Sequence, residues 1–378
     1  MKLSGILTLL LLASCAHVDK TPVVMSAKLI GTWDLKNPPS AGSDSKLEKL
    51  AGSLKLGGFS GLCCVKEQSG NFQLISISDR GPNEDPRKGA DDIEERPFLM
   101  PTYIPEILIS EWSEKYGWNF VERLPMRWEA YPRDSASGMP NSPSKDERPV
   151  DKAGKPLEFS RRGIDPEGIA YDSRRSHYWI VEEYGPSILK VDSKGRILNR
   201  WIPVGSGTHR DGIEELPAQL AERKSNRGFE GTALVDDTLY AFLQSPLAPD
   251  KSKIKVLAFN IATQKTIKIL DYSLHDSEAN KIGDVSALPD GRLLVLEQDG
   301  ETHDKALRKI FVWNPKDGTK TLVVDLTAAG FVGREKVEGL TLLSPTRLAV
   351  VTDNDYAVKG DFKSELAIFE VQIPAAKP

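Results

Sequence analysis

The apolar residues of the chain follow the pattern of β-strands rather than helices. From residue 50 onward they alternate with polar residues or run in groups of four to eight, and clusters of Gly, Pro, Asp and Asn separate these groups. There is almost no 3.6-residue spacing of the kind that marks an amphipathic helix. The pattern therefore predicts an all-β chain of short strands joined by tight turns.

One arrangement of strands recurs five times. Each copy begins with a polar or acidic residue and a small one, continues through an apolar strand, a turn and a second apolar strand, and ends in a polar cluster. The copies begin at GGFSGLCCV (57–65), GIDPEGIAY (163–171), NRGFEGTAL (226–234), KIGDVSAL (281–288) and EKVEGLTLL (335–343). Two more strand-like runs follow most copies, which gives four strands in roughly fifty to sixty residues. This repeat predicts a β-propeller of four-stranded blades, with five counted and room for a sixth.

The two ends of the chain predict how the ring closes. The last unit supplies only a third strand, ELAIFEVQI (365–373), and AKLIGTWDL (27–35) has the pattern of the missing fourth. Pairing the two would remove the open edge of the ring. A sixth blade would have to lie within residues 125–164, but this segment is rich in proline and poor in strand pattern, so we predict a long loop. Residues 27–378 would then form a single propeller domain.

The N-terminal segment has the features of a secretory signal. Lys2 precedes an apolar run from Ile6 to Leu12 and then small residues. The end of this run, Leu-Ala-Ser-Cys, resembles a bacterial lipobox, which predicts removal of residues 1–14, a lipid on Cys15 and a tether over residues 15–26. Ala16 favours the outer membrane, facing the periplasm. The alternative is a soluble exported protein that is cleaved after a nearby small residue.

Composition excludes several classes of function. The 50 basic and 54 acidic side chains are interleaved and give a net charge of −4, so there is no basic field for nucleic acid. The histidines lack the spacing of zinc ligands. Cys63 and Cys64 are adjacent, and neighbouring strand residues point to opposite faces, so we expect two thiols without a mutual disulfide. We expect a monomer.

The repeat places a set of polar residues at one end of the propeller. The start of the first strand of a blade and the end of the second lie on the same edge, beside the central channel. The strand starts carry Ser60, Glu167, Glu230, Asp284 and Glu338, and the strand ends carry Asp79, Glu183, Gln244, Gln298 and Asp353. Glu182, Glu297, Asn354 and Asp355 are close enough to replace members of the second set.

Several carboxylates in one narrow ring require positive charge, because an uncompensated buried carboxylate costs several kcal/mol or becomes protonated. Calcium is one candidate, since it takes six to eight oxygen ligands; its predicted ligands are Glu167, Glu230, Asp284, Glu338 and Asp353. Basic side chains are the other candidate: Arg80, Arg162, Arg227 and Lys336 lie near the same positions and could pair with the acids or bind an anion. A third interpretation is structural, with the acids holding the blades in register.

The motifs FSGL…ISDRG, DPEGIA…VEEYGPSI, NRGFEGTAL…AFLQSPL and VEGLTLL…VTDNDY resemble the phytase-like domain named for the esterase-like activity of phytase. The resemblance runs from about residue 50 to 373. It implies a β-propeller, hydrolysis of phosphate or carboxylic esters, and a distant relation to calcium-dependent propeller phytases. The residues that match the repeated motifs of the family are Asp79, Arg80, Glu167, Glu230, Glu338 and Asp353.

Two hypotheses of function follow. The first is a metal-dependent hydrolase that acts on a small anionic ester or phosphoester at the channel mouth. In this hypothesis Asp79 or Glu183 takes a proton from the attacking water, and Arg80, Arg162, Arg227, Gln244 and Asn354 bind the substrate. The second is a lipid-anchored propeller that binds a ligand or a protein without turnover, because one fold hosts unrelated functions.

Overall fold

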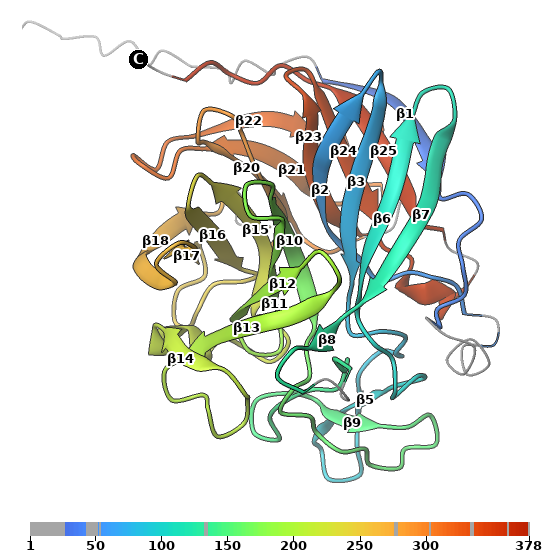
Figure 1. Ribbon diagram of the computed structural model, residues 1–378, viewed down its shortest axis with the longest axis vertical. Helices are drawn as coiled ribbons and strands as arrows, with labels where there is room; N and C mark the ends of the chain where they lie inside the picture. Colours follow the sequence, from blue (N-terminus) through green and yellow to red (C-terminus); the bar gives the residue numbers. More distant parts are fainter. Residues whose placement is uncertain are drawn as a thin grey trace, which may run out of the picture.

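The computed structural model describes residues 27–42, 52, 54–131, 135–275, 279–301, 304–332, 336–360 and 363–376. Within these residues five sheets each contain four antiparallel strands in the order of a blade, and no sixth blade is present (Figure 1). The predicted fold class, an all-β propeller with five blades, is confirmed. Cys15, the signal segment and the whole tether lie outside the described residues. No described helix has both the length and the apolar character needed to cross a membrane.

The blades follow one another along the chain. The first contains β2 (Phe59–Gln68), β3 (Asn71–Ser78), β6 (Glu106–Ser113) and β7 (Gly117–Pro125), and the second contains β10 (Pro166–Asp172), β11 (His177–Glu182), β12 (Ser187–Asp192) and β13 (Arg196–Pro203). The third contains β15 (Phe229–Val235), β16 (Thr238–Leu243), β17 (Lys253–Asn260) and β18 (Lys265–Ser273). The fourth contains β19 (Lys281–Ala287), β20 (Leu293–Gln298), β21 (Arg308–Trp313) and β22 (Lys320–Asp325).

The fifth blade joins the two ends of the chain. It contains β23 (Val337–Ser344), β24 (Arg347–Thr352), β25 (Glu365–Glu370) and, as its outermost strand, β1 (Lys28–Asp34). β1 runs antiparallel to β25, with Lys28 opposite Glu370 and Asp34 opposite Glu365. The predicted closure of the ring by the N-terminal strand is therefore confirmed, and it protects the edge of β25.

The innermost strands form the ring itself. β2, β10, β15, β19 and β23 contact one another in that order, and β23 contacts β2 again. Apolar side chains pack between the blades; for example, Trp201 of β13 and Phe259 of β17 lie 5.4 Å apart between their ring centroids. Cys63 and Cys64 of β2 are free thiols, as expected from their spacing.

Additional segments extend blades 1 and 2 at the end of the molecule that carries the candidate site. β5 (Glu94–Pro97) pairs with both β4 (Arg87–Lys88) and β9 (Arg148–Val150) in a small sheet, while β8 (Arg127–Trp128) and β14 (Ile213–Leu216) join the edge of blade 2 (Figure 1). The short helices η1 (Ala218–Glu222) and η2 (Asp355–Ala357) follow β14 and β24. Segment 125–164 contributes only the short strands β8 and β9 to this arrangement.

Candidate functional site

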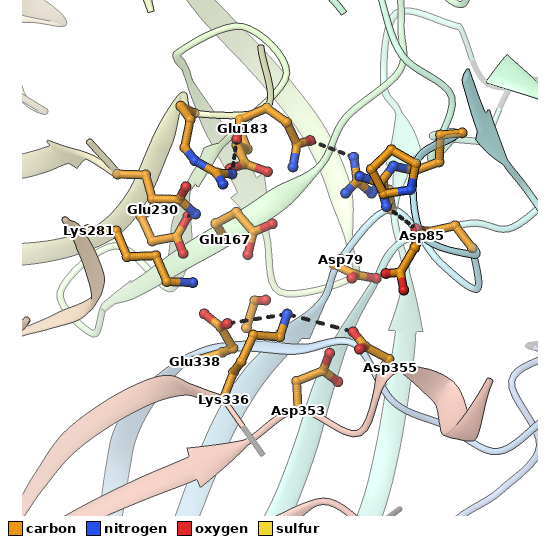
Figure 2. A pocket seen from close by; sticks show the side chains of 18 of the residues that line it. Asp79, Asp85, Glu167, Glu183, Glu230, Lys281, Lys336, Glu338, Asp353 and Asp355 are labelled. Carbon is orange, nitrogen blue, oxygen red and sulfur yellow. Dashed lines mark hydrogen bonds and ion pairs between the residues drawn. The ribbon is translucent and has the colours of Figure 1, made fainter. Parts of the chain in front are cut away.

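A pocket of about 370 Å³ lies where the inner strands begin, at the mouth of the channel (Figure 2). Eight of the ten predicted ring positions line it: Ser60, Asp79, Glu167, Glu183, Glu230, Gln244, Glu338 and Asp353. The other lining residues are Arg80, Asn83, Asp85, Pro86, Arg96, Asn226, Arg227, Lys281, Lys336, Asp355 and Lys359. Segments far apart in the sequence therefore bring their polar side chains to one opening.

A β-bulge explains how the repeated glutamates reach this opening. The register with the second strand shifts between Pro166 and Gly168, and equivalent shifts occur in blades 3 and 5. Glu167, Glu230 and Glu338 are the extra residues at these shifts. A bulged residue has no direct partner across the ladder, and its side chain is re-aimed. A carboxylate at the start of a buried strand can thus face the pocket.

Asp284 differs from these glutamates. The sequence placed it at the channel mouth as a calcium ligand, but in the structure it does not line the pocket. In blade 4 the shift lies between Ile282 and Asp284, so that Gly283 is the bulged residue. The buried Asp284 carboxylate accepts hydrogen bonds from the backbone N–H groups of Leu62 (3.2 Å) and Leu340 (2.7 Å). These belong to the inner strands of blades 1 and 5. Asp284 therefore ties strands together inside the channel instead of lining the pocket.

Other predicted residues also lie outside the pocket. Arg162 stacks over Tyr131, 4.1 Å from its ring centroid, and lies 3.6 Å from Asp211. The Asn354 side chain accepts a hydrogen bond from the N–H of Tyr356 and lines a neighbouring cavity. The alternatives Glu182 and Glu297 are satisfied by Arg200 and Tyr272 respectively, and the Gln298 amide donates to the Val337 carbonyl.

Three carboxylates from blade 2 converge on one side of the pocket. Asp165, Glu167 and Glu183 each offer an oxygen that lies within 4.8 Å of the other two. We call this set the acidic triad. Sequence reasoning missed Asp165, although it stands two residues before Glu167. Positions two apart in an extended chain face the same way, and this rule also identifies Lys281 and Lys336, each two residues before a bulged residue.

The acidic triad has little internal compensation. Burial raises the pKa of Glu167 well above its ordinary value, and the neighbouring Asp165, Glu230 and Glu183 raise it further. Within the described residues the Glu167 carboxylate has neither a hydrogen bond nor an ion pair. Burial also raises the pKa of Asp165 and of Glu183, although arginines beside them act in the opposite direction.

Two arginines adjoin the acidic triad. Arg80 lies 3.3 Å from Asp165, and its backbone N–H donates to the same carboxylate at 2.9 Å. It also lies 3.6 Å from Glu147, which Arg96 binds through two hydrogen bonds of 2.5 and 2.6 Å. This series of ion pairs connects the acidic triad to the small sheet. Arg227, whose side chain is 41% exposed, lies 3.7 Å from Glu183 and reaches the pocket from blade 3.

Lysines adjoin the acids on the opposite side. The Lys336 ammonium lies 3.7 Å from Glu338 and 3.7 Å from Asp355 (Figure 2). Glu230 accepts a 2.5 Å hydrogen bond from Gln244. Burial and the carboxylates of Glu183 and Glu338 raise the pKa of Glu230 well above its ordinary value, which the charge of Lys281 partly opposes.

Asp79 is held through one of its two carboxylate oxygens. Its Oδ1 accepts hydrogen bonds from the N–H of Gly81 at 2.8 Å and from the Tyr356 hydroxyl at 2.9 Å, while the Tyr103 hydroxyl lies 3.0 Å from that of Tyr356. Tyr356 has a φ of +55°, and at Gly58 an added Cβ would lie 2.3 Å from the Tyr356 hydroxyl. Burial raises the pKa of Asp79. Its Oδ2 has no hydrogen bond within the described residues.

The fold and the pocket place this protein among the β-propellers that carry a polar site at the mouth of the central channel. The chain belongs to the phytase-like family, whose model, described as "Esterase-like activity of phytase", matches residues 54–356. The resemblance found in the repeated motifs is therefore confirmed.

Other similarities are more distant. An "Uncharacterized secreted protein" of Arthroderma benhamiae is 24% identical over 179 residues, which cover 37% of this chain and 35% of that protein. Solved structures of similar shape include Pseudomonas fluorescens PhoX in complex with vanadate (9% identity, 92% and 95% of the two chains covered, TM-score 0.46). Another is the α-L-arabinofuranosidase PaAbf62A of Podospora anserina (8% identity, 94% and 99% covered, TM-score 0.44).

Proposed function

We propose that this protein is a metal-dependent hydrolase of phosphate or carboxylic esters, acting in the pocket at the channel mouth. The observation that carries the proposal is the acidic triad, in which the Glu167 carboxylate makes no hydrogen bond or ion pair within the described residues. Membership of the phytase-like family supports the reaction class.

The donor atoms of the acidic triad fit a hard divalent cation such as calcium. All are carboxylate oxygens, and neither histidine nor cysteine lines the described pocket. Glu183 Oε1 and Asp165 Oδ2 are buried and make no hydrogen bond, although Arg227 and Arg80 lie 3.7 and 3.3 Å from them. Asp165, Glu167 and Glu183 would hold the ion; Glu230, Glu338 and Asp353, which the sequence also suggested, have protein partners of their own. When bound, calcium would polarise the ester and lower the pKa of a bound water.

Basic side chains of the pocket would bind the anionic part of the substrate. Arg227 is exposed enough to meet a ligand, and Lys281 points into the pocket from blade 4 (Figure 2). Gln244 would orient the substrate beside Glu230. Arg80 is occupied by Asp165 and Glu147, so we assign it to positioning the acidic triad rather than to direct binding.

Asp79 is the group we assign to general-base catalysis. Gly81 and Tyr356 fix its Oδ1, which leaves Oδ2 available to take a proton from an attacking water. Glu183 is the alternative base, but a role as a metal ligand would prevent it from accepting that proton.

The test is an assay of p-nitrophenyl phosphate, p-nitrophenyl acetate and phytate before and after removal of calcium. We expect chelation to abolish turnover and added calcium to restore it. Glu167→Gln should lower kcat/KM by about 100-fold or more, whereas Glu158→Gln, which changes an exposed loop carboxylate, should have no effect. Turnover that survives exhaustive chelation would reject metal dependence. A folded, calcium-binding protein without turnover of any ester would favour the non-catalytic binding propeller.

We also propose that the protein is exported, anchored through a lipid on Cys15 to the outer membrane facing the periplasm, and monomeric. The pattern of residues 1–15 supports export, and the name of the Arthroderma relative agrees with it. Cys15→Ala should move the protein from the membrane fraction to the soluble fraction. Retention of this variant in the membrane would contradict the anchor.

A further inference from the structure

The pocket contains a second group of acids opposite the acidic triad. Glu338 lies at the start of β23, and Asp353 and Asp355 follow the end of β24. Asp353 and Asp355 are close enough to shift each other's pKa, with Asp355 raising that of Asp353. We call these three residues the second acidic group. Like the acidic triad, it consists of three carboxylates at the channel mouth, and by residue type alone it could hold a cation.

The structure already places a cation in the second acidic group. Lys336 precedes β23, and its backbone carbonyl accepts a hydrogen bond from the N–H of Asp353, which fixes the start of the side chain. Its ammonium is 3.7 Å from an oxygen of Glu338 and 3.7 Å from an oxygen of Asp355. Figure 2 shows the ammonium between these two carboxylates, directed into the pocket. Glu167 of the acidic triad also interacts electrostatically with Lys336.

We propose that Lys336 is a permanent cation of the second acidic group, so that the chain binds one divalent cation, at the acidic triad, and excludes another. The proposal rests on the metal dependence proposed above, and it concerns the number of ions and the residue that limits it. Unlike a bound metal ion, the charged side chain of a lysine is covalently attached and cannot be removed by a chelator.

Electrostatic repulsion opposes a second ion. A second ion beside Glu338 and Asp355 would stand close to the Lys336 ammonium, and like charges at such separations repel strongly in a site of low dielectric. The carboxylates would also have to release the lysine before they could coordinate the ion.

The experiment is calorimetric titration of the calcium-free full-length protein with Ca²⁺, which measures the number of bound ions per chain without an activity assay. Wild type should bind one ion. Lys336→Met removes the ammonium but keeps a side chain of similar length, and this variant should bind two. Lys336→Arg retains the charge and should bind one. Lys359→Met is the matched control, because Lys359 also pairs with Asp355, at 3.8 Å, but has a more exposed side chain. It should bind one.

The outcomes separate this inference from the proposed function. One ion in wild type and one in a folded Lys336→Met would overturn the inference and keep metal dependence. No ion in wild type but one in Lys336→Met would overturn binding at the acidic triad, and with it metal dependence, while supporting the exclusion of a cation by Lys336. Two ions in wild type would overturn the inference even if Lys336→Met failed to fold, and no ion in either protein would overturn both.

Discussion

Carboxylates at equivalent positions of the repeat have different partners in this pocket. Glu338 pairs with Lys336, and Glu230 accepts a hydrogen bond from Gln244, whereas Glu167 stands among other acids. The difference arises from the residue two positions earlier in the chain, which is Lys336 in blade 5 but Asp165 in blade 2. Repeated geometry therefore supports different chemistry in each blade.

This difference predicts opposite effects of two similar substitutions. In calcium-free buffer Glu167→Gln should stabilise the protein by about 1 kcal/mol or more, because it removes a half-buried carboxylate that stands among other acids and has no close ion pair. Glu338→Gln should destabilise it, since the substitution takes a partner from Lys336. Urea unfolding followed by fluorescence measures both. With saturating calcium the advantage of Glu167→Gln should disappear, and destabilisation by Glu167→Gln in calcium-free buffer would contradict the environment described for this residue.

Sequence reasoning identified most residues of the site but not their partners. The repeat was enough to place Glu167, Glu230 and Glu338 at one opening. It did not show which acid would be paired, because pairing depends on side chains from neighbouring blades and from the loops that carry Asp355 and Arg227. Arg162 illustrates this limit: it is close to the site in sequence, but Tyr131 and Asp211 hold it elsewhere.

At the scale of the strand, the glycine that follows the bulged glutamate in three of the blades has a packing role. An added Cβ at Gly231 would lie 2.8 Å from the backbone nitrogen of Val285, and one at Gly168 would lie 2.8 Å from that of Thr232. Both contacts are to the inner strand of the next blade. The glycines thus allow adjacent inner strands to approach closely around the channel.

Gly231→Ala should therefore destabilise the protein by about 1–3 kcal/mol, because the new methyl group meets backbone that has no room to move. Gly207→Ala is the control, since its nearest neighbour is the flexible side chain of Glu214, and it should cost less than 1 kcal/mol. Chemical denaturation of the two variants provides the comparison. Equal stability of both would show that the inner strands can separate without cost.

Blade 4 shows that a strand can be predicted correctly from the sequence while its residues are aligned wrongly with those of the other blades. Its motif reads Gly283-Asp284 where three other blades read Glu-Gly, and the acid alone suggested that Asp284 was equivalent to the glutamates. A displacement of one residue along a strand turns the side chain to the other face. Asp284 consequently meets the N–H groups of Leu62 and Leu340 inside the channel. Those donors belong to other blades and leave no signal in the local sequence.

The protein contains many carboxylates whose pKa values are raised by burial, and these groups determine how its stability should depend on pH. The group comprises Asp79, Asp146, Asp165, Glu167, Glu183, Glu230, Asp284 and Asp353. Each binds a proton more readily in the folded than in the unfolded chain. Its stabilising contribution is complete below the unfolded pKa, about 4, and is lost as the pH rises through the folded pKa.

In calcium-free buffer the melting temperature should therefore fall between pH 5 and pH 8, by on the order of 5 °C. Burial lowers the pKa of His177, so this residue makes stability rise with pH instead. It is a single, partly exposed group, and its effect is smaller than that of the carboxylates. Acids whose pKa is lowered, such as Asp355 beside Lys336, lose their contribution to stability only at lower pH.

Bound calcium favours the ionised carboxylates of the acidic triad. It should therefore make the melting temperature depend less on pH and should raise it most at pH 8. Thermal melts at constant ionic strength, with and without calcium, measure both effects. A calcium-free melting temperature that stays level or increases from pH 5 to pH 8 would mean that the pocket acids are neutralised within the protein and need no added cation.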